Sequence, residues 1–558
     1  MNPFNEEKNP KPRKEEFAQP ESAGNENLVP EESDLDEPVD GIILKYLKKY
    51  RQSTGSTCIE KQHLCQDVLN EICDSGSVTN PSIDMVNSTL SELVLRESIK
   101  AFEIGGEEYC YTAGDYYNES TLIEQLKRCM MATNTINPTD NEVAAALEAV
   151  LKEDCISMPD EQIRAVKLVI CSNVSIVTGG PGCGKTFLTK VIIKTIQKLM
   201  PNAKIRLAAT TAKAAQRLEA ATGMFAETVH SMVDYRKMRN YRVIPDSISA
   251  DLVVVDEVSM LTLYIAQRLF KMITPQTKVI LVGDPNQLPS IEPGDVLSDL
   301  LNSGTVKVAN LCTCHRQIST SREIASLANA VKTMQKIAIF PFPLRSTLDC
   351  PVHYVQEFFV GKVHNEVINT VKNLHDDLGY SYDDIQVISP TNTGYFGTDA
   401  LNIDLSNLVN PRRNNKAEFW PGDRVVCNRN ILDKDNRAKK TVVNGEVGEV
   451  VSVSGKDIEV QFGDKRMTLT ASRLTLAYAV TVHKAQGSEY KVVVLALHQG
   501  MGAVLSRSLL YTALTRAKEK IVVVGTVDAV MKAITDNRDG ERVTLLSQRL
   551  KNELKSIA

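Results

Sequence analysis

The chain has 558 residues, 43% of them hydrophobic and 24% charged, a composition that excludes fibrous and largely disordered proteins. Its length predicts roughly three to four domains. No stretch approaches the ~18 consecutive apolar residues of a membrane span, and the polar, acidic N-terminus contains no recognisable signal peptide, so we expect a cytoplasmic protein with no membrane partner.

Twelve cysteines are scattered without zinc-ligand spacing or a disulfide-framework pattern, which indicates reduced thiols. Residues 312–315 read Cys-Thr-Cys-His and resemble half of a metal site, but no second half follows, and buried thiols are the favoured interpretation. The net charge is −5. Residues 1–40 hold twelve acidic and four basic residues, a net of −8, which leaves +3 for the remainder. A near-neutral body can carry a basic groove, so the charge does not exclude a nucleic-acid partner.

Residues 1–38 are rich in Glu, Pro, Asn and Ser, which predicts a disordered acidic tail. In residues 39–133, apolar positions at helical spacing predict three helices, and residues 100–111 predict a β-hairpin with a Gly-Gly turn. Together they outline a winged helix, a fold that binds either DNA or protein. Because the hairpin carries three glutamates, we favour a scaffold or protein-docking role. The acidic tail is a second candidate for contact with a protein partner.

The stretch from Gly179 to Thr186 reads G-x-x-x-x-G-K-T and lies between a predicted strand and a predicted helix. This is the context of a P-loop, in which backbone N–H groups and a helix N-terminus surround a triphosphate. Lys185 is expected to reach the β- and γ-phosphates, and Thr186 to bind Mg²⁺. The residues predicted to contact ATP here are Gly179, Gly180, Pro181, Gly182, Cys183, Gly184, Lys185, Thr186 and Phe187.

Four polar residues elsewhere in the sequence extend this predicted ATP site. Gln162 lies upstream of the P-loop strand, where its amide is placed to pair with adenine. An apolar strand ends in Asp256, which would hold Mg²⁺ through water, and Glu257, which would orient and polarise the attacking water. A further strand leads to Gln287, a candidate sensor of the γ-phosphate. The sequence therefore predicts hydrolysis of ATP with Mg²⁺.

A second series of apolar strands begins near residue 352. From about residue 418 to 474, polar and apolar residues alternate between Asn-Gly, Ser-Gly and Gly-Asp turns, which predicts a small antiparallel barrel inserted into an α/β domain. Apolar runs at 492–497 and 521–525 then return to parallel-sheet character. A switch ATPase needs one nucleotide-binding core, so the second series favours a two-domain motor.

In this order the motifs resemble those of superfamily 1 helicases, most closely the RecD-like and Dda-like branch that moves 5′→3′. The likeness runs from about residue 158 to 525, with a weaker one at 109–126. The matching stretches are 179–186, 213–218, 256–257, 283–289, 316–317, 476–490 and 510–518, and residues 443–448 resemble the family's inserted SH3-like domain.

The resemblance implies an α/β fold with two RecA-like P-loop motor domains and ATP between them. They would span residues 134–343 and 344–558, with a short β-hairpin insertion at about 233–246 and an SH3-like β-barrel insertion at about 418–474. A mostly helical domain, residues 39–133, would precede them.

The same resemblance assigns roles to individual residues. Arg316 and Arg516 would approach the transferring phosphoryl group from opposite sides of the cleft. Gly487 and Glu489 would contact the nucleotide, Glu489 at its sugar. The single-stranded DNA track would include Thr211, Lys213, His230, Thr481, His483 and Lys484.

Between Tyr235 and Ile244, four basic residues meet no acidic one: Arg236, Lys237, Arg239 and Arg242. The segment also contains tyrosines that favour a strand and are able to stack on bases, so a DNA-binding β-hairpin is predicted. In RecD-like helicases an insertion at this place forms a pin at the duplex junction. The alternative is a solvated charged loop.

We therefore predict a DNA helicase that hydrolyses ATP to translocate on single-stranded DNA, 5′→3′ by resemblance, and to unwind duplex junctions in repair, recombination or replication. Two alternatives stay open. One is the motor subunit of a nuclease–helicase complex, with cutting left to a partner because no nuclease-like cluster of carboxylates and lysine is visible. The other is a DNA-dependent P-loop ATPase that does not unwind.

Overall fold

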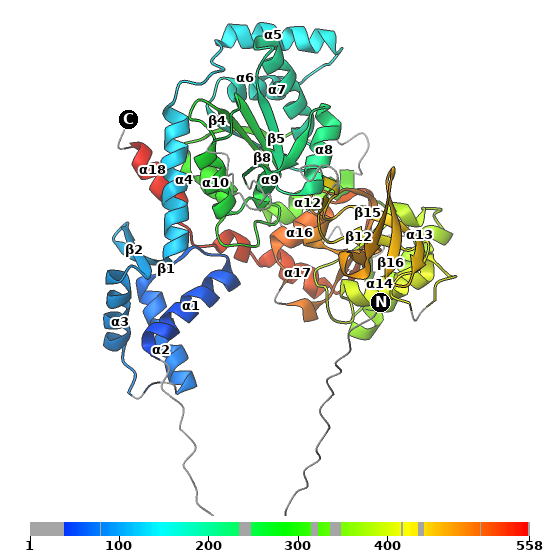
Figure 1. Ribbon diagram of the computed structural model, residues 1–558. Helices are drawn as coiled ribbons and strands as arrows, with labels where there is room; N and C mark the ends of the chain where they lie inside the picture. Colours follow the sequence, from blue (N-terminus) through cyan, green and yellow to red (C-terminus); the bar gives the residue numbers. More distant parts are fainter. Residues whose placement is uncertain are drawn as a thin grey trace, which may run out of the picture.

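The computed structural model describes residues 38–76, 78, 80–233, 247–313, 322–334, 348–414, 417–432, 440–502 and 504–555. Residues 1–37 of the predicted acidic tail, the basic hairpin residues 236–242, Arg316 and the second half of the Cys-Thr-Cys-His stretch lie outside these ranges. Figure 1 shows a helical N-terminal domain in blue, an α/β domain in cyan to green, and a second α/β domain joined by an antiparallel β domain in yellow to orange.

The first α/β domain is built on a parallel sheet in the order β6-β5-β7-β8-β4-β9. Its strands are β4 (Val174–Gly179), β5 (Ile205–Ala209), β6 (Ala226–Thr228), β7 (Leu252–Asp256), β8 (Lys278–Gly283) and β9 (Lys307–Leu311). One face is covered by helices α5 (Asp140–Glu153), α6 (Asp160–Ile170), α7 (Lys185–Leu199) and α8 (Ala212–Thr222). The other is covered by α4 (Ala113–Met131), α9 (Val229–Val233), α10 (Leu263–Met272) and α11 (Val296–Ser303).

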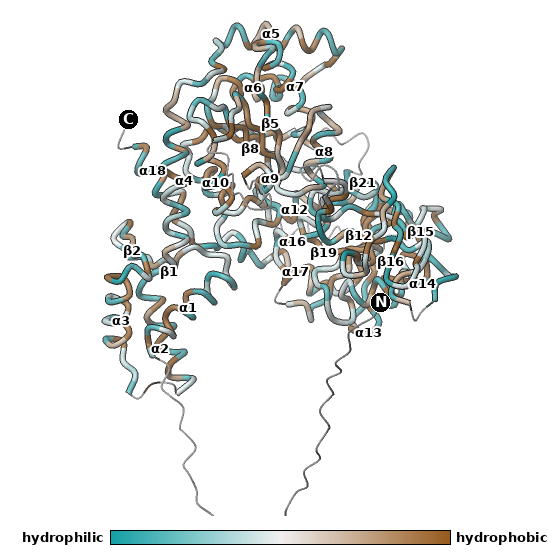
Figure 2. The backbone as a smooth tube through the Cα atoms, viewed as in Figure 1, coloured by the Kyte–Doolittle hydropathy of each residue, from teal (hydrophilic) through white to brown (hydrophobic). Residues whose placement is uncertain are grey.

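The central strands are mostly apolar because both of their faces are covered. In β7, Leu252 and Val254 point into the core below α5–α8, whereas Val253 and Val255 point into the core below α4, α9 and α10. Figure 2 shows the region around β5 and β8 as mostly brown, whereas the surrounding helices carry more hydrophilic teal. In a parallel sheet the carboxyl ends of all strands share one edge, so the P-loop and Asp256 meet there.

The second α/β domain has a parallel sheet in the order β10-β21-β20-β11-β19. Its strands are β10 (Val352–Gln356), β11 (Ile385–Ser389), β19 (Ala479–Thr481), β20 (Tyr490–Leu497) and β21 (Ala517–Gly525). Their core is shared with α12 (Arg322–Thr333), α13 (Val360–Asp376), α14 (Thr398–Val409), α15 (Val482–Ala485), α16 (Arg507–Leu514) and α17 (Val527–Thr535). Two parallel sheets with helices on their faces agree with the predicted pair of α/β domains.

An antiparallel β domain is inserted between α14 and β19, close to the predicted range of about 418–474, and its last strand ends two residues later at Leu476. Its sheet order is β17-β16-β15-β12-β18. The strands are β12 (Arg424–Cys427), β15 (Val447–Ser454), β16 (Asp457–Phe462), β17 (Lys465–Thr470) and β18 (Leu474–Leu476), beside a pair of β13 (Ile431–Leu432) and β14 (Lys440–Val442). It buries its own core around Phe419, Val460 and Phe462. At Gly448 a Cβ would lie 2.6 Å from the carbonyl oxygen of Gln461, so the strand crossing there requires glycine.

The N-terminal domain contains α1 (Val39–Thr54), α2 (Lys61–Ser75) and α3 (Ile83–Leu95), followed by the hairpin of β2 (Ile99–Ile104) and β3 (Glu107–Thr112). A short strand that the sequence did not reveal, β1 (Cys58–Glu60), pairs with β3. The predicted domain end at residue 133 does not coincide with the packing, because α4 runs from this domain into the core of the first α/β domain.

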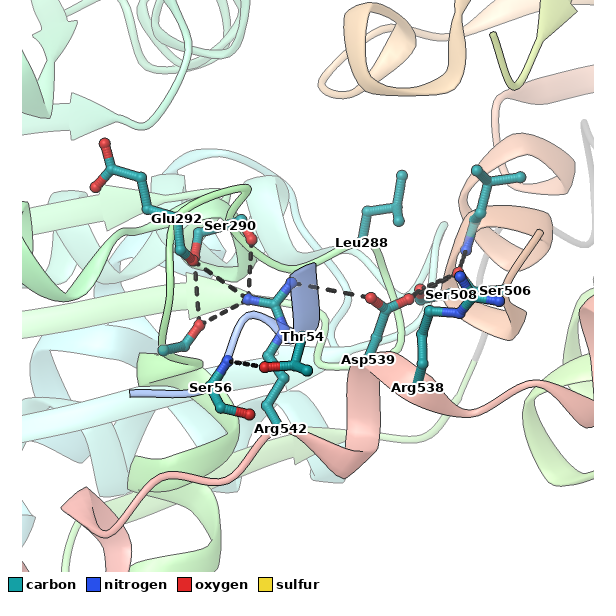
Figure 3. A network of polar contacts seen from close by, with 12 residues as sticks. Thr54, Ser56, Leu288, Ser290, Glu292, Ser506, Ser508, Arg538, Asp539 and Arg542 are labelled. Atoms are coloured by element: carbon teal, nitrogen blue, oxygen red, sulfur yellow. Dashed lines mark hydrogen bonds and ion pairs between the residues drawn. The ribbon is translucent and has the colours of Figure 1, made fainter. Parts of the chain in front are cut away.

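The C-terminal segment returns from the second α/β domain to the first. Helix α18 (Leu546–Lys555) buries Leu546 and Leu550 in the core that α4 and α10 share, although the sequence placed these residues in the second domain. Before it, Arg542 donates through Nη1 to the carbonyl oxygens of Ser290 (2.9 Å), Gly294 (2.9 Å) and Glu292 (3.3 Å), while Asp539 accepts a bond from Ser506 in the second domain (2.7 Å; Figure 3). This segment joins the two α/β domains.

No helix within the described ranges is long and apolar enough to cross a membrane. Those ranges also contain no group of three or more His, Cys, Asp and Glu residues able to hold a metal ion together.

Candidate active site

The P-loop has the predicted strand–loop–helix form. Every residue of β4 is buried, and α7 begins at Lys185 directly after the loop. Gly182 (φ 74°) and Gly184 (φ 84°) adopt the left-handed conformation that favours glycine. At Gly179 a Cβ would lie 2.7 Å from the carbonyl oxygen of Leu311 in β9, so only glycine fits. The sequence thus folds this loop tightly enough for its N–H groups to surround phosphate.

Lys185 and Gln162 both contact carbonyl oxygens of this loop. The Nζ of Lys185 donates to the carbonyl oxygens of Gly179 (2.6 Å) and Gly180 (2.9 Å), which holds the ammonium at the mouth of the loop. Gln162 is buried in α6, and its Nε2 lies 3.5 Å from the carbonyl oxygen of Cys183. Pairing of Gln162 with adenine stays a prediction. Thr186 and Phe187 follow Lys185 on α7, and both line the cleft.

Asp256 and Glu257 lie at the carboxyl end of β7. Strand β8 separates β7 from β4, the strand that leads into the P-loop. Asp256 Oδ1 accepts the N–H of Glu257 (2.9 Å), and its Oδ2 is buried without a hydrogen-bond partner among the described residues. Burial and the neighbouring Glu257 raise the pKa of Asp256 to about 6, against the lowering effect of Arg217 and Lys185. A buried carboxylate oxygen with no donor fits a cation, as the P-loop arrangement requires for Mg²⁺.

Gln287 reaches the same cleft from the loop after β8. Its side chain is buried, and its Oε1 has no hydrogen-bond partner among the residues that the structure describes. The loop is held by Asp284, which accepts bonds from the backbone and side chain of Asn286 (3.1 and 3.0 Å). An unpaired buried amide beside the P-loop fits the predicted contact with phosphate or the attacking water.

The second α/β domain faces this edge with the amino ends of two neighbouring strands. Glu489 precedes β20 and Arg516 precedes β21, and the N–H of Tyr490 donates to the carbonyl oxygen of Arg516 (2.9 Å). The buried guanidinium of Arg516 donates to the carbonyl oxygens of Thr512 (3.0 Å) and Ser488 (3.2 Å). Burial lowers the pKa of Arg516, and Glu257 and Glu489 oppose this effect, so the charge stands near both carboxylates.

Arg217 is a site residue that the sequence analysis did not assign. It projects from α8 into the cleft, with its Nη2 3.7 Å from Oε1 of Glu257 and its Nη1 3.7 Å from Oε1 of Glu489. The sequence offered one signal for this role. Arg217 lies four residues after Lys213, on a helix that starts at the carboxyl edge of the sheet. Contact with Glu489 depends on the second domain and has no signature in the sequence.

Together these side chains enclose a cleft of about 430 Å³ between the two α/β domains. The residues that line it are Pro181, Gly182, Gly184, Lys185, Thr186, Phe187, Arg217, Glu257, Gln287, Glu489 and Arg516. One side supplies a phosphate-binding loop and carboxylates, and the other supplies a buried arginine. This arrangement defines a P-loop nucleotide hydrolase whose site is shared by two domains.

The residues predicted to contact DNA lie on both α/β domains. Thr211 caps α8 by accepting the N–H of Ala214 (3.2 Å), and a Cβ at Gly487 would lie 3.2 Å from Thr211 Oγ1. Lys213 lies over the ring of Tyr490, 5.5 Å from its centre, and burial lowers the pKa of Lys213. His230 is exposed on α9.

In the second domain, Thr481 caps α15 by accepting the N–H of Lys484 (3.3 Å), and it is the register partner of Ser389 in the neighbouring strand. His483 is half-buried, and burial lowers its pKa, whereas Lys484 is exposed. The short distance between Thr211 and Gly487 shows that the two domains touch beside this set of residues. Contact of the predicted DNA-binding side chains with DNA stays a prediction.

Two family comparisons match the two α/β domains. Residues 157–339 match the family described as AAA domain, and residues 476–524 match the UvrD-like helicase C-terminal domain. The ATP-dependent RecD2 DNA helicase of Deinococcus radiodurans is 30% identical over 76% of this chain and 56% of its own length. The RecBCD enzyme subunit RecD of Mycolicibacterium smegmatis is 30% identical over 70% of this chain and 75% of its own length.

This chain belongs to the RecD-like family of ATP-dependent superfamily 1 DNA helicases. It spans only 56% of the length of the Deinococcus relative. A crystal structure of Pif1 helicase from Bacteroides with ADP-AlF3 and single-stranded DNA is 18% identical, covers 72% of this chain and 98% of its own, and has a TM-score of 0.42. That similarity is too low to carry an argument about ligands.

Proposed function

We propose that this chain hydrolyses ATP in the cleft between its two α/β domains and uses the cycle to move along single-stranded DNA and separate duplex. The observation that carries the proposal is the composition of the cleft, in which Lys185, Glu257 and Gln287 of one domain face Glu489 and Arg516 of the other. A site divided in this way links the state of the nucleotide to the distance between domains, which is what a stepping motor needs.

In this proposal the P-loop N–H groups and Lys185 bind the phosphates, and Thr186 and Asp256 hold Mg²⁺, which neutralises charge on the β- and γ-phosphates. Glu257 orients the attacking water, and Gln287 contacts the water or the γ-phosphate. Arg516 and Arg316 stabilise the charge that develops on the transferring group. Gln162 and Glu489 contact the base and the sugar.

The strand would cross both domains along the predicted DNA residues, from Thr211 and His230 to Thr481 and Lys484. Residues 233–246 would form the pin at the junction. The two RecA-like motor domains would correspond to residues 134–343 and 344–558, except that α12 packs into the second core and α18 into the first. We assign the antiparallel β domain to the SH3-like insertion, and the N-terminal winged-helix-like domain and acidic tail to contact with a protein partner in the cytoplasm.

A second candidate is the motor subunit of a larger nuclease–helicase complex. It is favoured by relatives named RecBCD enzyme subunit RecD, one of which, from Haemophilus influenzae, is 25% identical over 88% of this chain and 91% of its own length. Purification of the chain from its native extract under mild conditions separates a free enzyme from a subunit that brings nuclease activity with it.

Strand displacement on 5′-tailed and 3′-tailed duplexes, with and without ATP, tests the proposed function. We expect unwinding of the 5′-tailed substrate alone, only with ATP, and none by Lys185→Ala. ATP hydrolysis that ignores single-stranded DNA at low salt, together with no displacement of either duplex, would contradict the motor and favour a non-unwinding ATPase.

A further inference from the structure

Helix α8 connects the predicted DNA track with the ATP cleft. It starts at the capping residue Thr211, at the carboxyl edge of the first sheet, and runs to Thr222. Ala214, Ala215 and Leu218 pack its inner side into the core. Its remaining side chains are therefore free to face the second domain and the cleft.

The outer side of α8 contacts the segment that leads into β20. Lys213 lies over the ring of Tyr490, Gly487 packs against Thr211, and one turn after Lys213 the guanidinium of Arg217 reaches Glu489 (3.7 Å). Gln216, between them, lies 3.4 Å from Glu446 of the inserted β domain. Helix α8 thus carries one continuous part of the contact between the two α/β domains.

Arg217 is the member of this contact that also touches the catalytic side of the cleft. Its second N–H group lies 3.7 Å from the carboxylate of Glu257, which is only 8% exposed. Placed between Glu257 of the first domain and Glu489 of the second, Arg217 is shared by two carboxylates that belong to different domains. The other oxygen of Glu489, Oε2, lies 3.6 Å from Lys518 of its own domain, so Glu489 keeps a cation when it loses Arg217.

The backbone of Glu257 is held in place, but this does not fix the direction of its carboxylate. A cation such as Arg217 is needed to orient the carboxylate. The φ of 55° at Glu257 is in the left-handed region, a strained conformation for a residue with a Cβ that is held in place by surrounding structure. Thr210 Oγ1 donates to the carbonyl oxygen of Glu257 (2.9 Å), and the N–H of Glu257 is bonded to Asp256. These bonds hold the main chain, whereas the carboxylate itself is paired with Arg217.

We propose that Arg217 is a positioning residue for ATP hydrolysis, which orients the Glu257 carboxylate toward the attacking water and, through Glu489, makes that orientation depend on contact between the two motor domains. This inference rests on the proposed function. When the domains meet, Glu489 and Glu257 share Arg217. When they separate, Glu489 keeps its contact with Lys518, and Arg217 pairs with Glu257 alone. Because α8 begins at Thr211, single-stranded DNA bound at Thr211 would contact the same helix that carries Arg217.

The test compares Arg217→Gln and Arg217→Lys with wild type in steady-state ATP hydrolysis with single-stranded DNA. We expect kcat to fall about 10²-fold in Arg217→Gln, the range of a misplaced general base, with KM for ATP changed little. Arg217→Lys keeps the charge and should recover part of kcat. The matched control is Arg206→Gln, since Arg206 also pairs with a glutamate, Glu227, but lies in β5 away from the cleft. Thermal unfolding and fluorescent ATP-analogue binding check that each variant is folded.

The deciding measurement is a double-mutant cycle in single-turnover reactions. If Arg217 acts through Glu257, then adding Arg217→Gln to Glu257→Gln causes no further loss of rate. If Arg217→Gln lowers the rate as much in the Glu257→Gln background as in the wild-type background, Arg217 acts independently and the proposal is overturned. An effect of Arg217→Gln on KM alone would also overturn it. Wild type that hydrolyses no ATP would overturn the proposed function as well, whereas active wild type with an equally active Arg217→Gln variant overturns this inference alone.

Discussion

The hydroxyl of Tyr511, on α16 of the second domain, donates a hydrogen bond to Oδ2 of Asp284, 2.9 Å away at the carboxyl end of β8. Both side chains are buried. The N–H of Leu288, in the same loop, donates to Thr512 Oγ1 (2.8 Å). Helix α16 ends beside Arg516, so the loop that carries Gln287 and the helix that leads to Arg516 are attached to each other.

Tyr511→Phe removes the donor and leaves a buried carboxylate oxygen without it, which costs roughly 1–3 kcal/mol. We expect weaker closure of the two domains and a kcat for DNA-stimulated ATP hydrolysis lower by roughly tenfold, since about 1.4 kcal/mol corresponds to that factor. Tyr395→Phe, which removes an exposed hydroxyl in the second domain, is the matched control. Equal kcat and equal melting temperature for the two variants would show that the Tyr511 bond contributes nothing.

Arg516→Ala should bind ATP but lose hydrolysis by about 10³-fold or more, as expected for a group that acts on the transition state. Because Arg516 is buried and bonded to two carbonyl oxygens, Arg516→Lys serves as a second variant that keeps the charge. Binding of a fluorescent ATP analogue and single-turnover hydrolysis separate the two steps. Arg466→Ala, an exposed arginine of the inserted β domain, is the control. Weakened ATP binding combined with a normal hydrolysis rate at saturating ATP would contradict a role of Arg516 in the transition state.

Replacement of residues 236–242 by a short Gly-Ser turn should uncouple the two activities. These residues lie outside the described ranges, and the prediction rests on their four basic side chains and on Tyr235 and Tyr241. DNA-stimulated ATP hydrolysis should persist because the cleft is unchanged, and unwinding should collapse because nothing separates the base pairs. The two rates are measured on the same forked substrate. Unwinding at the wild-type rate would place the wedge elsewhere.

The sequence predicted the P-loop, the strand that ends in Asp256 and the strand that leads to Gln287. Each of these is a local pattern of fewer than about a dozen residues. The sequence also predicted the inserted β domain, whose alternation and turns lie in one continuous stretch. The bond between Tyr511 and Asp284 joins positions 227 residues apart, and no local pattern announces it. Helical spacing places Leu546 and Leu550 on one side of α18, but it does not specify which core receives them. Strand β1 has three residues, too few for a periodicity.

Lys278 gives a pH dependence with a definite sign. It is buried in β8, its Nζ donates to the carbonyl oxygen of Ser172 (2.5 Å), and burial lowers its pKa to about 8. Between that value and its ordinary range near 10.5, the unfolded chain binds a proton that the folded protein does not. Stability due to this group therefore rises with pH in that window.

Lys278→Met removes this titration. The melting temperature of the variant minus that of wild type should be greatest near pH 7 and fall by the equivalent of about 3 kcal/mol toward pH 10, since one pKa unit corresponds to about 1.4 kcal/mol. Lys271→Met, on α10 where the side chain is exposed, controls for general loss of charge. A difference that stays constant between pH 7 and 10 contradicts the lowered pKa.

The C-terminal helix should be required for stability through one buried ion pair. Arg549 donates to Glu119 Oε2 (3.2 Å), and its guanidinium lies over the rings of Phe102 (4.6 Å) and Tyr116 (4.9 Å). Glu119 is fully buried and also accepts bonds from Thr57 and Tyr111. Arg549→Met leaves a buried carboxylate without its cation, a change that typically costs about 3–5 kcal/mol.

The pH dependence of that loss has a sign as well. Burial raises the pKa of Glu119 and Arg549 lowers it, so removing Arg549 raises it further. The folded variant then takes up a proton at a higher pH than the unfolded chain does, and its deficit against wild type should shrink as the pH falls from 8 toward 5. Adding Glu119→Gln to Arg549→Met should restore part of the melting temperature at pH 8. Lys551→Met, on the exposed side of the same helix, should change little. A deficit that neither narrows at low pH nor responds to Glu119→Gln would show that Arg549 stabilises the helix through its aromatic contacts alone.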